Sequence, residues 1–305
     1  MALDTTAHDI YRGTSGITLP AEISSEIWAK AQENSIIMQV SPRITLPGPG
    51  LSIPVITADP VAGIVAEATE KPVSNSTFAT KTMTPYKFAV IELFSNEFRR
   101  DLPRLYNECV NRLPNAIGKA FDKAVFGSAS VGSGFDVLGG CDAVALDASG
   151  KTVYEQLLVA METVANYGGT LDGWVLSPQG EVVLLSETDQ VGRPLFTSTV
   201  ADRAIGRVLG ADTYRSGAVY KDGDSTPTPD VLGFAGDWSQ TRWGMVETIE
   251  LAISDQATIN DGSKQLNLWQ RNMFAVRVEA ELSFVSNADS NSKKPIVRLT
   301  RAHAS

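Results

Sequence analysis

Histidine and cysteine are scarce in this chain, which contains two of each among its 305 residues. His8 and His303 lie at opposite ends of the sequence, so neither is placed for a Ser–His or Cys–His catalytic pair or for a histidine metal site. Cys109 and Cys141 form no disulfide framework and no metal motif, and we expect both to be free thiols. The sequence therefore predicts no metal site and no imidazole- or thiol-based catalysis.

Long apolar runs and an excess of basic residues are also lacking. No stretch approaches the roughly 20 apolar residues of a membrane span, and MALDTTAHDIYRG lacks the basic-then-apolar pattern of a signal peptide. The net charge is -9, whereas affinity for nucleic acid normally needs a basic surface. Lys293, Lys294, Arg298 and Arg301 are expected to form a solvated terminus. Membrane association and tight DNA binding are therefore not predicted.

Two glycine-containing segments are similar to nucleotide-binding motifs but do not match them. ASGKT at 148–152 is similar to the end of a phosphate-binding loop, which has a glycine where this sequence has Ala145. A turn and a helix cap explain this segment, because TVYE, starting at Thr152, fits a capping box. GSGFDVLGG follows a predicted helix rather than a strand, so it does not fit a dinucleotide-binding turn. The sequence thus predicts no cofactor and no enzyme.

The stretch Leu51–Ser95 predicts a long two-stranded ribbon without a core of its own. Pro54, Pro60, Pro72 and Pro85 interrupt it, and proline cannot donate a hydrogen bond within a central strand. A two-stranded ribbon alone in water is marginally stable at best. We therefore expect another protein chain to hold this ribbon, and the protein to assemble.

The rest of the chain predicts an α+β fold. The N-terminal residues predict an arm with a short helix starting at Pro20, and apolar residues at spacings of three and four predict a long helix over Leu105–Phe126. A capped helix, the buried strand GWVLS and the helix PQGEVVLLSET follow. TRWGMVETIELAIS and MFAVRVEAELSFVS predict two long strands.

Six segments, in this order, resemble the major capsid proteins of tailed double-stranded-DNA bacteriophages, which have the Hong Kong-97-type fold. The match extends roughly from Ile17 to Arg298. The segments are LPAEISSEIW, EATEKPVSNSTF, FGSASVGSGFDVLGG, GWVLSPQGEVVLLSETDQVGRPLF, FAGDWSQTRWGMVETIELAISD and LNLWQRNMFAVRVEAELSF.

The resemblance implies four parts. They are an N-arm at 1–45, an extended β-hairpin or E-loop at 46–94, a peripheral domain with a long spine helix at 95–139 and 256–305, and an axial α/β domain at 140–255. It also implies that the E-loop contacts a neighbouring subunit, and the expected contact residues are Pro60, Glu67, Lys71, Phe78 and Lys81.

The implied function is structural. The chain is expected to self-assemble through hexamers and pentamers into an icosahedral head shell, which encloses double-stranded DNA without sequence-specific binding. The expected partners are a separate scaffolding protein, because the arm follows soon after Met1, together with a portal and decoration proteins. The expected location is the virion capsid, after synthesis in the host bacterial cytoplasm.

Some members of this family join their subunits by a Lys–Asn isopeptide bond that a nearby glutamate promotes. In RNMFAVRVE, Asn272 and Glu279 match the acceptor segment. The donor position falls on Thr80, with Lys81 one residue along, and a shift of one residue on a strand points a side chain to the other face. We therefore favour an ordinary polar pair over a crosslink.

Two alternatives remain open at this point. An encapsulin-type bacterial nanocompartment would keep the same fold, and a peroxidase or ferritin-like neighbouring gene would indicate it, whereas a portal or terminase gene would indicate a phage head. A soluble α/β enzyme of unknown chemistry is the second alternative. The lack of catalytic motifs argues against it, and a monomer that forms no particles would support it.

Overall fold

The structure is a computed structural model. It describes residues 35–58, 62–65, 70–71, 73, 77–101, 103–189, 191–196, 206–223, 228–246, 250–260, 265–286 and 294–302. The expected arm helix and both histidines lie outside these ranges. The chain forms two compact units, unit 1 (Met1–Gln39, Tyr86–Lys123, Met245–Leu282) and unit 2 (Val40–Pro85, Ala124–Gly244, Ser283–Ser305). None of the described helices is both long and apolar enough to cross a membrane.

The central strand of unit 1 is β14 (Met273–Ser286), which confirms the long strand predicted for MFAVRVEAELSFVS. β4 (Tyr86–Ser95) and β11 (Glu250–Ser254) pair with it on either side, both antiparallel. Successive side chains of a strand point to opposite faces. On β14, Val276 and Val278 are accordingly buried while Arg277 is exposed.

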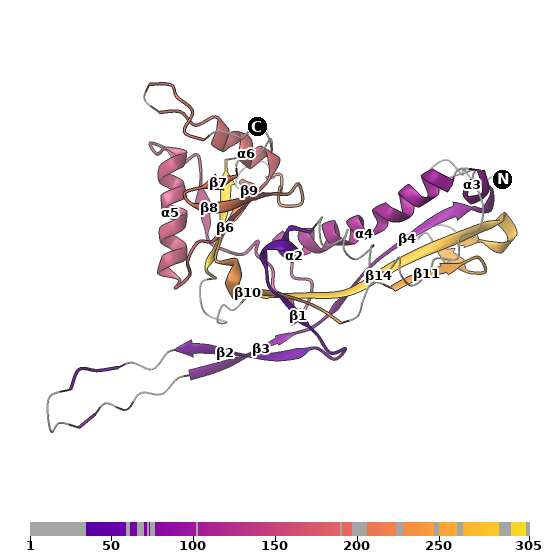
Figure 1. The fold of residues 1–305 in the computed structure, drawn as a ribbon, viewed down its shortest axis with the longest axis horizontal. Helices are drawn as coiled ribbons and strands as arrows, with labels where there is room; N and C mark the ends of the chain where they lie inside the picture. Colours follow the sequence, from indigo (N-terminus) through magenta and orange to yellow (C-terminus); the bar gives the residue numbers. More distant parts are fainter. Residues whose placement is uncertain are drawn as a thin grey trace. The chain divides into compact units, whose positions relative to one another are not determined.

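The long helix predicted from the apolar spacing is α4 (Pro103–Phe126), and it packs on the apolar face of this sheet. The ring of Phe121 on α4 meets Phe88 of β4 edge to face, with ring centroids 5.7 Å apart. Two short helices complete this part of the unit, α2 (Ile36–Val40) and α3 (Asn96–Asp101). Figure 1 shows α4 running along β4 and β14.

A small hairpin and a turn lie between β11 and β14 in the sequence. β12 (Thr258–Asn260) pairs with β13 (Gln265–Asn267), and the 3-10 turn η2 (Trp269–Arg271) follows. Leu268, which is fully buried, packs with Met273 and with Ile259 of β12. This apolar cluster holds the hairpin and the turn against the start of β14.

Unit 2 contains a six-stranded sheet in the order β5-β15-β9-β6-β8-β7. The strands are β5 (Ala143–Ala145), β15 (Ile296–Arg301), β9 (Asp230–Gly236), β6 (Gly173–Leu176), β8 (Ala211–Arg215) and β7 (Arg207–Val208). Helices α5 (Val153–Asn166) and α6 (Pro178–Leu185) pack on it, with Leu157, Trp174, Leu184 and Leu299 in one buried cluster. The strand and helices predicted for this part of the sequence are confirmed.

The segment ASGKT forms the turn and helix cap that the sequence predicts. The Thr152 hydroxyl accepts a hydrogen bond from the Glu155 amide at 3.2 Å, and the Glu155 carboxylate accepts one from the Thr152 amide at 3.0 Å. This reciprocal capping box satisfies two amides at the start of α5. The segment therefore has a structural role in the fold.

The C-terminal strand corrects two expectations. β15 pairs with β9 and β5 in the six-stranded sheet. Residues 296–301 therefore do not belong with the rest of the segment 256–305, which was assigned to the peripheral domain. Four basic residues before and within it were expected to be solvated, and of these Arg301 is exposed while Lys293 lies outside the described residues. The expectation is corrected for the other two, because Lys294 donates to the Val137 carbonyl and Arg298 to the Gly139 carbonyl, each at 2.8 Å. The strand is buried because it has neighbours on both sides, which a short apolar run does not reveal.

The ribbon is shorter than expected. It consists of β2 (Leu51–Ala58) and β3 (Thr77–Met83), which form a two-stranded sheet of their own. β4 follows Pro85 and pairs with β14, so the expected ribbon Leu51–Ser95 and the expected E-loop 46–94 both extend too far. Pro85 marks the break, because it has no amide hydrogen with which to continue the β2–β3 ladder.

The long strand predicted for TRWGMVETIELAIS is also divided, into β10 (Thr241–Met245) and β11. β10 and β1 (Arg43–Thr45) belong to the sheet order β1-β10-β14-β11. Near this point Leu46 and Met83, both buried, approach Gly244 closely. A Cβ added at Gly244 would lie 2.6 Å from Leu46 and 3.0 Å from Met83. The absence of a side chain at Gly244 therefore lets the last residue of β3 pack inside its own unit.

Candidate subunit interface

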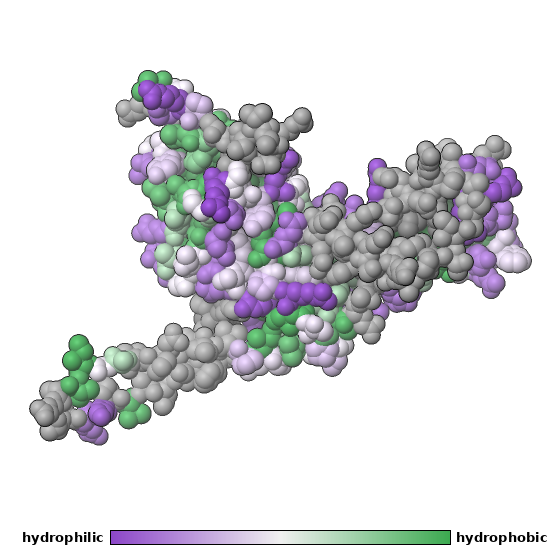
Figure 2. All heavy atoms as spheres, in the orientation of Figure 1, coloured by the Kyte–Doolittle hydropathy of each residue, from purple (hydrophilic) through white to green (hydrophobic). Residues whose placement is uncertain are grey.

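The far end of the ribbon carries apolar side chains that nothing in the described chain covers. Figure 1 shows β2 and β3 beside each other without a third strand next to them. Beyond these strands, Ile64 is fully exposed and Val73 almost fully. Figure 2 shows apolar surface at this end of the ribbon. Exposed apolar groups at the end of an unsupported ribbon are typical of a contact with another protein.

The near end of the ribbon, in contrast, is bonded to its own chain. The Lys81 ammonium lies 2.5 Å from the Asp136 carboxylate and donates to the Ser286 carbonyl at 2.5 Å. The same carboxylate accepts hydrogen bonds from the Ser286 amide at 2.9 Å and from its hydroxyl at 3.1 Å. Lys81, Asp136 and Ser286 therefore form a polar anchor at the base of β3.

A turn at Gly134 adds a second attachment at the same place. The Thr84 amide donates to the Gly134 carbonyl at 2.9 Å. Gly134 has a φ of +77°, and a Cβ there would lie 2.4 Å from the Thr84 hydroxyl oxygen. A residue with a side chain would be strained in this conformation and would collide with Thr84. Glycine at this position is what lets the loop before Asp136 close onto the ribbon base.

The five expected contact residues have different outcomes. Pro60 and Glu67 lie outside the described residues. Lys71 is exposed and lies in neither a helix nor a strand. Phe78 lies on β3 opposite Ile56, and its side chain is outside the described part. Lys81 has partners in its own chain, a role that the sequence did not predict.

The three residues of the disfavoured crosslink, Lys81, Asn272 and Glu279, do not form a set within one chain. Asn272 precedes β14 and Glu279 lies within it, so at about 3.3 Å per residue they are roughly 23 Å apart along the strand. The Asn272 amide group donates to Glu97 at 3.0 Å, and the Glu279 carboxylate lies 3.5 Å from Arg277. Within one subunit Asn272 and Glu279 therefore do not pair with each other, because each has separate polar neighbours.

Asp136 and Asp122 are the polar residues that the sequence analysis missed. Asp122, on α4, is fully buried and accepts hydrogen bonds from the Ser35 hydroxyl at 2.6 Å and from the Ile36 amide at 2.9 Å. Burial raises the pKa of this carboxyl to about 6, against the opposing effect of these hydrogen bonds. The sequence does contain a signal for Asp122, because a carboxylate directly after Phe121 interrupts the apolar pattern of the helix and indicates a buried polar contact. Asp136 gives no such signal in the sequence.

The aspartate-rich loop before β9 has internal hydrogen bonds. Asp230 accepts from the Gly223 amide at 2.8 Å, and Asp222 accepts from the Tyr220 hydroxyl at 3.3 Å. Within the residues that the structure describes, no three histidine, cysteine or acidic side chains gather in an arrangement that could hold a metal ion. Burial raises the pKa of the Cys141 thiol to about 11, so it is protonated at neutral pH.

A ribbon with an anchored base and an uncovered apolar end defines a protein that assembles with other chains. The chain belongs to the phage capsid family, whose sequence profile matches residues 15–284. Its fold is the Hong Kong-97 type, as the sequence resemblance implied. Proteins of this family are structural proteins of the virion capsid that assemble into shells, and they are not enzymes.

Three known proteins illustrate the relationship. The chain is 31% identical over 304 residues to the "Probable major capsid protein gp17" of Mycobacterium phage L5, with 94% of this chain and 90% of the relative covered. It is 31% identical over 284 residues to the protein of the same description in Mycobacterium phage D29, with 88% and 86% covered. A solved chain of Mycobacterium phage Adephagia has the same fold, with a TM-score of 0.72, 22% identity, and 89% and 91% covered.

Proposed function

We propose that this chain is the major capsid protein of a tailed bacteriophage, and that it forms an icosahedral head shell of hexamers and pentamers around double-stranded DNA. The single observation that carries the proposal is the β2–β3 ribbon. Its base is fixed by Lys81 and Asp136, while Ile64 and Val73 at its other end are exposed. Such a ribbon extends over an adjacent subunit and covers its apolar end there.

The parts of the subunit receive the following assignment. The six-stranded sheet with α5 and α6 is the axial domain, and α4 is the spine helix of the peripheral domain. The E-loop is residues 46–85, shortened to end before β4. Residues 1–45 serve as the N-arm.

The proposed partners follow from the same role. A separate scaffolding protein guides assembly, a portal occupies one vertex, and decoration proteins bind the finished shell. The DNA is enclosed without sequence-specific contacts, in keeping with the net charge of -9. The subunit is made in the host bacterial cytoplasm and ends in the virion.

We further propose that the subunits are held without covalent bonds. The Lys81 ammonium is in an ion pair with Asp136, and an ammonium must lose its proton and leave this pair before it can attack an amide. Boiled and denatured shells should therefore run as single-subunit bands on a gel. Ladders of joined subunits would contradict this.

Electron microscopy of the purified full chain tests the main proposal. Closed shells, hexamers or pentamers are expected. A protein that stays monomeric across assembly conditions would overturn the proposal. Closed shells that contain a cargo enzyme instead of DNA when isolated from their native source would indicate the nanocompartment alternative.

A further inference from the structure

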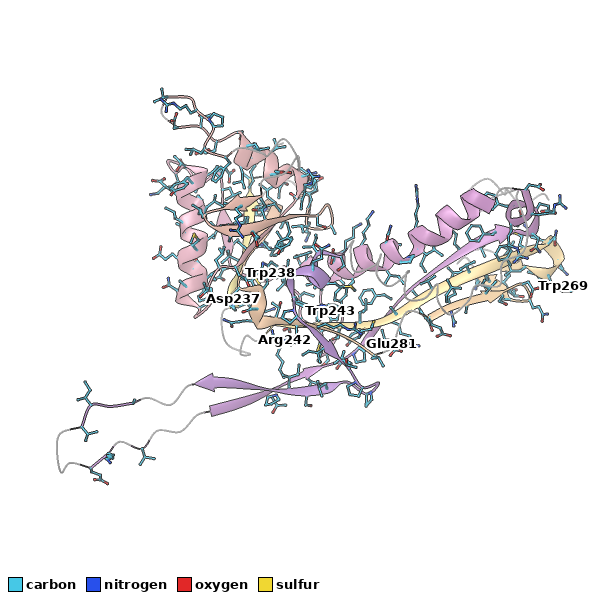
Figure 3. The ribbon with its side chains drawn as sticks, in the orientation of Figure 1. Asp237, Trp238, Arg242, Trp243, Trp269 and Glu281 are labelled. Atoms are coloured by element: carbon cyan, nitrogen blue, oxygen red, sulfur yellow. The ribbon has the colours of Figure 1, made fainter. Side chains whose placement is uncertain are left out.

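Trp269 differs from the other tryptophans that the structure describes. Trp174, Trp238 and Trp243 are 0%, 1% and 1% exposed, whereas Trp269 is 70% exposed. It is the first residue of η2, and Figure 3 labels it at the end of the sheet where β14 begins. Tryptophan carries the largest apolar surface of any side chain, so this degree of exposure needs an explanation.

The residue before Trp269 occupies the apolar interior at this turn. Leu268 is fully buried and packs with Leu93, Ile259 and Met273. Its amide donates to the Ala257 carbonyl at 3.2 Å, and its own carbonyl accepts from the Met273 amide at 3.0 Å. The backbone is thus bonded on both sides of the turn, and Trp269 is left outside the apolar cluster.

Asn272, the residue that ends the turn, is also held by hydrogen bonds. Asn272 has φ 55° and ψ 42°, a left-handed conformation that is uncommon for residues other than glycine. Its side chain donates to Glu97 at 3.0 Å and accepts from the Asn96 side chain at 2.9 Å. Its carbonyl accepts from the Asn96 amide at 2.9 Å. The turn that carries Trp269 is therefore ordered before any partner binds.

An ordered and exposed indole is well suited to be an interface anchor. Binding loses less conformational entropy when the anchoring side chain stands on a rigid turn. Tryptophan is also enriched among the few residues that provide most of the binding energy of protein interfaces. We propose that Trp269 is an anchor residue in the contact between two copies of this chain, which rests on the self-assembly described above.

The local charge indicates why the partner is a second copy. Around this turn α3 and η2 carry three cations, Arg99, Arg100 and Arg271, and two carboxylates, Glu97 and Asp101. The whole chain has the opposite balance, with 26 basic and 35 acidic residues. The five charges of α3 and η2 sum to one positive charge, whereas the chain as a whole carries a net charge of -9, and this difference favours association with another copy.

Fluorescence quenching by acrylamide provides a direct test. A Trp28→Phe variant of the full chain removes the one tryptophan outside the described residues, so Trp269 becomes the main quenchable indole. Unassembled subunits should then be quenched strongly, and shells assembled from this chain alone, without DNA, should be quenched at least about threefold less, as expected for a buried hot-spot side chain. The Trp28→Phe, Trp269→Phe double variant should show weak quenching in both states.

The outcomes separate this inference from the proposed function. Shells that form normally but leave Trp269 as quenchable as in the subunit would overturn the anchor and leave the capsid function intact. Protection that appears only after DNA is added would also overturn it. Failure of the chain to form any particle, also when the proposed scaffolding protein is supplied, would overturn the proposed function itself.

A pair of substitutions gives a second readout. Trp269→Ala should reduce the yield of particles at least about tenfold, because removing a hot-spot side chain costs more than one order of magnitude in affinity. Trp269→Phe keeps an aromatic ring and should retain most of the yield. Circular dichroism of the unassembled variants checks that both are folded. Equal yields for Trp269→Ala and the parent would contradict the proposal.

Discussion

The two ends of the β2–β3 ribbon have opposite surroundings. At the base, Met83 is fully buried and Lys81 is paired with Asp136 in the same chain. At the far end, Ile64 and Val73 are exposed. Burial of the base contributes to the stability of the subunit, whereas Ile64 and Val73 are not buried within the described part of their own chain. Under the proposed function, the comparison separates residues that fold the subunit from residues that assemble it.

The largest effect is expected from removing the far end while keeping the base. Ala58 faces Thr77 in the ribbon register, so replacing residues 59–76 with Asn-Gly closes the ribbon with a tight hairpin turn. Assembly should be lost, because the exposed apolar end is gone. The free energy of unfolding should change by less than about 1 kcal/mol, as for an exposed loop.

Electron microscopy and denaturant unfolding measure these two effects. An Ile64→Ser, Val73→Ser variant of full length is the matched control, since it keeps the chain length and removes only the apolar groups. It should also assemble poorly. A shortened chain that unfolds would show that the far end packs on its own subunit, which would remove the distinction between the two ends.

A substitution in the buried base should instead lower the stability of the unassembled subunit. Met83→Ala removes a fully buried side chain next to Leu46 and Gly244, and such changes destabilise a protein by about 2–5 kcal/mol. Thr82→Ala, at the exposed neighbouring position, should change stability by no more than about 0.5 kcal/mol. Chemical denaturation of unassembled subunits measures both. Equal effects of the two substitutions would contradict the packing of the base.

A pH dependence is expected from Asp122. Its pKa is raised from 3.8 to about 6 by burial, so the folded subunit binds this proton more tightly than the unfolded chain does. The resulting stabilisation is complete below pH 3.8 and is lost as the pH rises through about 6, and it amounts to about 3 kcal/mol at most.

Calorimetry between pH 5 and pH 7.5 checks this dependence. Asp122→Asn keeps the shape of the side chain and one of its two acceptor oxygens, and it removes the titration. The unfolding temperature of the variant minus that of the parent should therefore rise between pH 5 and pH 7.5, because only the parent loses stability over this range. A difference that does not change with pH would show that Asp122 titrates normally.

The smallest effect is expected at the polar anchor. Lys81 and Asp136 are each 23% exposed, and Asp136→Asn keeps an acceptor for the Ser286 amide while removing the ion pair, which should cost about 1 kcal/mol. Arg207→Gln is the control in the same unit, because its ion pair with Asp212 is far more exposed. Denaturant titration should show a smaller loss for the control. A larger loss for the control would contradict the role of the anchor.

Local patterns in the sequence predicted several elements correctly. The three- and four-residue spacing located α4, and TVYE located the capping box of α5. The two-stranded ribbon was also predicted, because its prolines argued against a place in a larger sheet. In these cases the determining interactions lie within one element or between adjacent ones.

The misplaced elements depend on partners that are distant in the sequence. β4 alternates like the ribbon that precedes it, and its pairing with β14 has no local signal. β15 is a short apolar run whose neighbours, β5 and β9, lie far before it in the chain. The contact between Lys81 and Asp136 also joins residues distant in the sequence, and it has no local signal. Lys81 was expected to contact a neighbouring subunit because the family resemblance placed it in the E-loop.

Cryo-electron microscopy of the assembled particle tests the central claim, that the far end of the ribbon is completed by another subunit. We expect residues 62–73 to lie against a second copy of the chain with Ile64 and Val73 buried, while Lys81 keeps its contact with Asp136. A particle in which these two apolar residues stay exposed, or pack on their own subunit, would contradict the account.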